Sequence, residues 1–150
     1  MPVIEESVFI ACPPEVVFDF IVKPENLPVW DSSIITAAQV GDEPIGVGTR
    51  SDGSSKIMGR HFDWTVAVEE YDRPRRYSSH SVGGSLQFTV TNVLEPAEGG
   101  TTLTYRIDAA SGLGGVFGRL ADPFVTRAQG RTVRANLETL AELLAAHPGG

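Results

Sequence analysis

The stretch FIACPPEVVFDFIVKPENLPVWD, residues 9–31, runs from an apolar strand through four prolines to a tryptophan and an aspartate. Residues 3–11 alternate between apolar and polar side chains, which predicts a strand with one buried face. Pro13 and Pro14 end that strand, and a proline suits the first helical turn, where its missing amide costs no hydrogen bond. Pro24 ends this first helix, and PENLPVW predicts a second short helix joined to it in a V.

The segments that follow are typical of an antiparallel sheet, because alternating runs are separated by turn residues about every ten positions. Together with the first strand they predict six or seven strands. The further strands are expected at residues 33–41, 47–59, 61–71, 77–84, 85–96 and 101–109. Residues 116–146 instead place apolar side chains three and four positions apart, which predicts a long amphipathic helix with a kink at Pro123.

Composition limits the classes of protein that fit this pattern. With 150 residues, 41% of them hydrophobic, the chain is expected to form one domain over residues 1–147 with a frayed tail at 148–150. A net charge of −7 argues against a nucleic-acid partner, which clustered Lys and Arg would have to bind. No apolar run is long enough to insert in a membrane, no secretory signal is visible, and Cys12 has no disulfide partner, so we expect a cytoplasmic protein.

Four motifs give this order of elements a family resemblance. They are SVFIACPPEVVFDFIVKPENLPVWD at 7–31, VGT at 47–49, VEEYDRPRRY at 68–77 and LEPAEGGTTLTY at 94–105. Together they resemble the START-like (SRPBCC) superfamily and, within it, the polyketide cyclase/dehydrase and lipid transport family. Cys12 is a departure, since the family usually has alanine there. The resemblance implies an α+β helix-grip fold, in which a curved antiparallel sheet wraps around the long C-terminal helix and leaves space for a small apolar ligand.

Strand alternation and the helical pattern name the side chains that would face this space. The expected ligand-binding residues are Trp64, Tyr77, Phe88, Val90, Asn92, Tyr105, Phe117, Leu120 and Phe124. An apolar and aromatic lining of this kind is common in small-molecule pockets. Alternatively, these side chains pack on one another and close the core. Trp30 likewise has two interpretations, an anchor under the short helices or a wall of the pocket.

Motifs for cofactors, metals and nucleophilic serines are missing from the sequence. Residues 111–118, SGLGGVFG, have phenylalanine where a dinucleotide fingerprint needs its third glycine, so no cofactor is expected. The three histidines have no metal-ligand spacing, and no serine sits in a G-x-S-x-G turn. No metal site and no hydrolase chemistry are therefore predicted.

Three classes of function remain open. The favoured one is a carrier that binds or sequesters a lipid, a polyketide or a similar small apolar molecule in the cavity. The second is an enzyme of the cyclase or dehydratase type, implied by the resemblance, with Tyr77, Tyr105 and His80 as first suspects for proton transfer. Binding is favoured because the expected inner face carries almost no Asp, Glu, His or Lys. The third class is recognition of a protein partner through the surface, for which no exposed apolar helix is evident.

Overall fold

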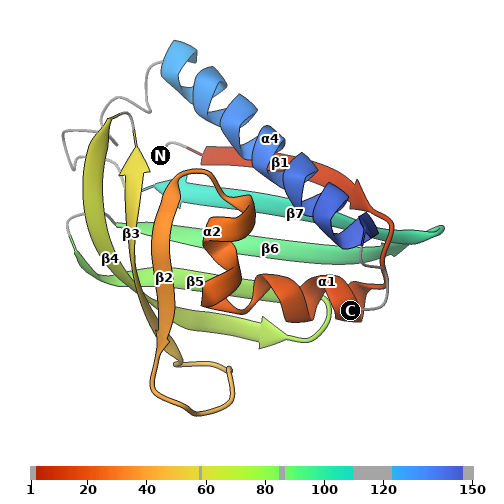
Figure 1. Ribbon diagram of the computed structural model, residues 1–150, viewed down its shortest axis with the longest axis horizontal. Coiled ribbons are helices and arrows are strands. Elements are labelled where there is room, and N and C mark those ends of the chain that lie inside the picture. Colours follow the sequence, from red (N-terminus) through yellow and green to blue (C-terminus); the bar gives the residue numbers. More distant parts are fainter. Residues whose placement is uncertain (1–2, 58, 85–86, 110–122, 147–150) are drawn as a thin grey trace.

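The structure is a computed structural model that describes residues 3–57, 59–84, 87–109 and 123–146 (Figure 1). Its elements, in chain order, are β1 (Val3–Ile10), α1 (Pro14–Ile21), the 3-10 turn η1 (Pro24–Asn26), α2 (Leu27–Trp30), β2 (Ile34–Val40), β3 (Arg50–Ile57), β4 (Arg60–Asp72), β5 (Arg76–Gly84), β6 (Phe88–Ala97), β7 (Gly100–Ala109) and α4 (Pro123–Ala146). The seven strands and the short helices after β1 confirm the prediction made from the sequence.

One antiparallel sheet holds all of these strands, in the spatial order β1-β7-β6-β5-β4-β3-β2. Strands β1 and β2 follow each other in the sequence yet form the two opposite edges of the sheet. Helices α1 and α2 connect these edges, and α4 lies across β1 and β7 on the same face of the curved sheet (Figure 1). This is the expected helix-grip fold of the α+β class.

Prolines begin the short helices, as residues 9–31 predict. Pro14 is the first residue of α1, Pro24 is the first residue of η1, and α2 has a proline in its first turn. Helix α1 directs Val17 and Phe18 into the core, where both side chains are fully buried. The two short helices therefore close one end of the sheet and cover its apolar face.

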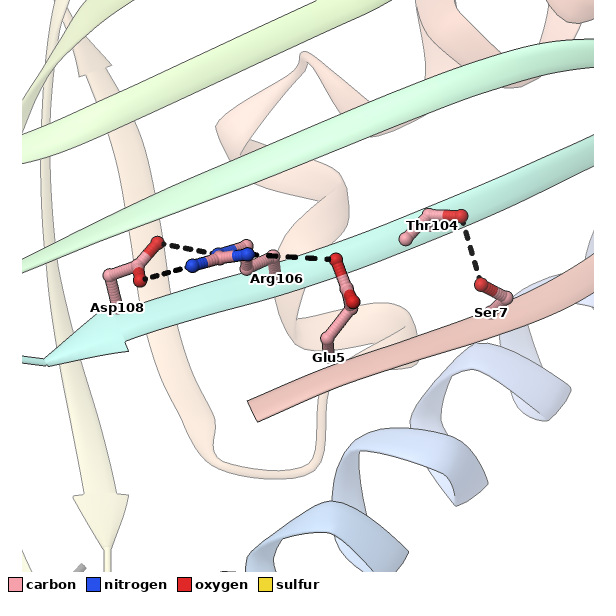
Figure 2. A network of polar contacts seen from close by, with 5 residues as sticks. All are labelled: Glu5, Ser7, Thr104, Arg106 and Asp108. Atoms are coloured by element: carbon pink, nitrogen blue, oxygen red, sulfur yellow. Dashed lines mark hydrogen bonds and ion pairs between the residues drawn. The ribbon is translucent and has the colours of Figure 1, made fainter. Parts of the chain in front are cut away.

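The two faces of the sheet differ sharply in character, as β1 and β7 illustrate. On the outer face the guanidinium of Arg106 donates to both carboxylate oxygens of Asp108, at 3.0 and 3.1 Å, and lies 4.0 Å from the carboxylate of Glu5 (Figure 2). The alternate residues Leu103 and Tyr105 are buried on the inner face. Alternation along these strands thus separates a charged surface from an apolar interior.

Helix α4 completes the core. Its buried side chains recur at helical spacing and pack against the inner face of the sheet; they are Val133, Leu137, Leu140 and Leu144. Pro123 is the first residue of the described helix, while residues 116–122, expected in the same helix, lie outside the described residues. No helix among the described residues is both long and apolar enough to cross a membrane.

Candidate functional site

A cavity of about 190 Å³ lies between the inner face of the sheet, the short helices and α4. Its apolar lining is Ile4, Ile21, Val22, Pro24, Leu27, Trp30, Ile34, Trp64, Val66, Tyr77, Phe88, Val90, Tyr105, Ile107 and Val133. Its polar lining is Asp31, Ser33, Ser51, Ser55, Ser79, Asn92, Gln129, Thr132 and Asn136. The inner side chains therefore do not close completely on one another.

The structure brings six of the predicted ligand-binding residues together around this cavity. These are Trp64 on β4, Tyr77 on β5, Phe88, Val90 and Asn92 on β6, and Tyr105 on β7. Their shared orientation follows from alternation, because every second side chain of a strand points to the same face. Phe117, Leu120 and the side chain of Phe124 were predicted to face them from the helix, and these lie outside the described residues.

Trp64 is held in its place on the wall by two neighbours. Its indole Nε1 donates to the hydroxyl of Ser55 at 2.8 Å, which satisfies the buried donor. Its ring lies directly against the backbone of Gly53 on β3, where a Cβ atom would overlap the ring and the carbonyl oxygen of Thr36. The glycine therefore makes room for the large aromatic wall of the cavity.

The two tyrosines in the wall are held in apolar surroundings. Burial raises the pKa of both Tyr77 and Tyr105 above the ordinary value of a phenol. The ring of Tyr105 packs edge to face against Trp30, with ring centres 6.1 Å apart. Both phenols therefore stay protonated at neutral pH, so they offer hydroxyl groups and no negative charge to a ligand.

Asp31, a buried carboxyl group, also lines the cavity and was not predicted from the sequence. Its side chain is only 7% exposed. Its Oδ1 accepts three hydrogen bonds, from the Ser33 amide at 2.9 Å, the Ser33 hydroxyl at 2.7 Å and Asn136 Nδ2 at 3.1 Å. Burial is the largest influence on this group and raises the pKa of Asp31, although the hydrogen bonds from Ser33 act in the opposite direction.

Asp31 is the one Asp, Glu, His or Lys among the described lining residues, where the sequence predicted almost none. Alternation along strands could not find it, because it follows the short helix α2 and precedes β2. One signal was available in the sequence. Asn136 interrupts the apolar stripe of α4 between Val133 and Leu137, and a polar residue in such a stripe indicates a buried polar partner.

Two further polar atoms on the inner side are enclosed by protein and have no hydrogen-bond partner among the described residues. They are Nε1 of Trp30 and Oδ1 of Asn92. Trp30 is 4% exposed and belongs both to the core cluster and to the cavity lining. The two interpretations of this residue, anchor and wall, are therefore compatible.

The remaining suspect for proton transfer lies away from the cavity. His80 does not line it; its side chain is 41% exposed and its Nδ1 lies 3.7 Å from a carboxylate oxygen of Glu69. Within the described ranges, no group of three His, Cys, Asp or Glu side chains is arranged to hold a metal ion. The described residues that line the cavity thus offer a ligand one carboxyl group, several hydroxyl groups and a few amide groups in an otherwise apolar wall.

One known protein family matches nearly the whole chain. A profile described as "Polyketide cyclase / dehydrase and lipid transport" matches residues 1–145. The chain belongs to this family. A comparison with functionally curated proteins finds no match.

Solved structures agree with this family assignment. The protein TTHA0849 from Thermus thermophilus is 26% identical, with a TM-score of 0.79 over 97% of this chain and 99% of that one. A START superfamily protein from Mycobacterium smegmatis is 16% identical, with a TM-score of 0.75 over 95% and 98% of the two chains. The di-domain ARO/CYC protein BexL of the BE-7585A biosynthetic pathway is 20% identical, with a TM-score of 0.70 over 99% of this chain and 48% of that one. The last two similarities establish the fold alone.

Proposed function

We propose that this polyketide cyclase/dehydrase and lipid transport family member binds a small apolar molecule in the cavity between sheet and α4, as a carrier or sequestering protein. The observation that carries the proposal is the cavity of about 190 Å³ with its largely apolar and aromatic lining. Burial of apolar surface supplies affinity at roughly 25 cal/mol per Å², and a few polar groups orient the ligand. Trp64, Tyr77, Phe88, Val90, Asn92 and Tyr105 are the proposed contact residues.

Native mass spectrometry of the protein purified from its own host, followed by solvent extraction, tests this proposal. A stoichiometric lipid, polyketide or other apolar molecule supports the carrier function and identifies the ligand. A protein that emerges empty and also fails to bind a panel of apolar fluorescent probes contradicts it.

A matched pair of variants on β6 separates cavity binding from binding elsewhere. Val90→Phe places extra volume inside the cavity and should abolish or strongly weaken probe binding. Thr91→Phe adds the same ring to the neighbouring residue, whose side chain points to the outer face, and should leave binding unchanged. Equal binding by both variants would contradict a site in this cavity.

An enzymatic function of the cyclase or dehydratase type is the second candidate, and Asp31 is the observation that favours it. A carboxyl whose pKa is raised by burial in a cavity is a suitable group for proton transfer. Tyr77 and Tyr105 supply phenol groups on the same lining. To test this, the wild-type protein and an Asp31→Asn variant are each incubated with the extracted ligand, and the products are analysed by mass spectrometry. A loss of water or a new ring isomer formed only by the wild type supports catalysis.

We also propose a cytoplasmic location. The one cysteine of the chain, Cys12, is buried and has no partner for a disulfide, which suits a reducing compartment. Fluorescence microscopy of a tagged protein in its own host tests the location.

A further inference from the structure

Asp31 is the only acidic side chain among the described residues that line the cavity. A carboxyl group in an apolar wall is costly, because burial removes the water that would solvate its charge. Part of the cost is offset by its three hydrogen bonds from Ser33 and Asn136.

All three of those hydrogen bonds end on the same oxygen, Oδ1. The other oxygen, Oδ2, accepts none from the described residues. It is also not among the buried polar atoms that protein encloses completely without a partner. Asp31 lines the cavity, and Oδ2 is its carboxyl oxygen without a hydrogen bond from the described residues, so we infer that Oδ2 faces the open space.

The orientation of Oδ2 is fixed by two separate parts of the fold. Ser33 lies just before β2, whereas Asn136 reaches Asp31 from α4. Asn136 is itself oriented, since its Oδ1 accepts from the amide of Ser32 at 3.2 Å. Rotation of the Asp31 carboxyl would break bonds to both elements, so Oδ2 is held ready for a ligand.

A hydroxyl is the ligand group that suits this oxygen in either protonation state. When Asp31 is ionised, Oδ2 accepts a hydrogen bond. When Asp31 is protonated, its proton belongs on Oδ2, because three donors already surround Oδ1. A carbonyl can pair only with the protonated form and an ammonium only with the ionised form, whereas a hydroxyl both donates and accepts.

We propose that the cavity selects apolar molecules that carry a hydroxyl group, and that Oδ2 of Asp31 binds this hydroxyl. The inference rests on the proposed binding function and adds the chemical class of the ligand. The other polar atoms without partners are less suitable anchors, because Nε1 of Trp30 and Oδ1 of Asn92 are enclosed by protein. Asp31 is thus a specificity-determining residue at the polar point of an apolar cavity.

Two probes of nearly equal shape, naphthalene and 2-naphthol, test the proposal by fluorescence titration at pH 7. The wild-type protein should bind 2-naphthol about tenfold more tightly than naphthalene, the size expected for one hydrogen bond to a charged group. In Asp31→Leu, a side chain of similar size, no polar atom replaces Oδ2, so nothing at this position can donate to a hydroxyl or accept from it. This variant should bind naphthalene as before and lose most of the preference for 2-naphthol.

Asp19→Leu is the matched control, since Asp19 is an exposed aspartate on α1 that pairs with Arg73 and does not line the cavity. It should keep the preference for 2-naphthol. Equal affinity of the wild type for both probes, or an unchanged preference in Asp31→Leu, would overturn the role of Asp31 while leaving cavity binding intact. Failure of the wild type to bind either probe would overturn the binding function and the selection together.

Discussion

Gly53 and Trp64 form the contact that gives the cavity its aromatic wall. A methyl group at Gly53 would occupy the space of the Trp64 ring and approach the carbonyl of Thr36. The ring would have to turn toward the cavity or β2 and β3 would have to separate. We expect Gly53→Ala to lower the free energy of unfolding by about 1–3 kcal/mol, the usual cost of overpacking, as measured by urea denaturation. The displaced ring should also weaken binding of apolar probes.

Gly83 on β5 offers a control for the general effect of replacing a glycine in this sheet. A methyl group there would meet Thr65 at 3.6 Å, an ordinary contact distance. Gly83→Ala should therefore leave stability unchanged or raise it slightly, since alanine restricts the unfolded chain. Equal destabilisation by the two substitutions would show that the Trp64 contact is not the cause.

Helix α4 is tied to the start of β2 by one side chain, Asn136. Its amide donates to Asp31 and accepts from the backbone of Ser32, so it links two elements that are distant in the sequence. Asn136→Ala leaves a buried carboxyl oxygen and an amide with one bond fewer. We expect a loss of about 1–3 kcal/mol in the free energy of unfolding, again from urea denaturation, because unsatisfied buried polar groups are costly.

Thr139, one turn further along α4, provides the comparison. Its exposed hydroxyl bonds only to the carbonyl of Ala135 within the helix, at 3.1 Å. Thr139→Ala should change stability by less than about 0.5 kcal/mol, as is usual for surface positions. Alanine is the better helix former at both positions, so a similar loss in the two variants would mean that the link to Asp31 is not its cause.

The elements that could be predicted from the sequence are those whose apolar residues recur at a regular spacing or whose ends are marked by prolines. The prolines at 13, 14 and 24 indicate the short helices, and alternation places Trp64, Val90 and Tyr105 on the inner face. Alternation succeeds along β4 although the pairing with β5 shifts register between Thr65 and Val66 and again after Val68. Asp31 could not be found in this way, because its burial depends on Asn136, 105 positions away.

On the scale of the whole molecule, acidic groups of two kinds make opposite contributions to the pH dependence of stability. The exposed Asp19 pairs with Arg73 through two hydrogen bonds of 2.7 and 2.8 Å, and this arginine lowers the pKa of Asp19. Its contribution to stability is present above the unfolded pKa and is lost as the pH falls through the folded pKa. Burial raises the pKa of Asp31, so the opposite dependence is expected there.

The sign for Asp31 follows from proton counts. Between its unfolded pKa, near 3.8, and its raised folded pKa, the folded protein holds a proton that the unfolded chain has released. Stability from this group therefore falls as the pH rises through that window, and the loss persists at neutral pH. Asp31→Asn removes the titration, so the difference in unfolding free energy, variant minus wild type, should increase from acidic to neutral pH. Asp19→Asn should show the reverse trend, and urea denaturation at a series of pH values measures both. A flat difference for Asp31→Asn would mean that the group is not buried with a raised pKa, whatever it binds.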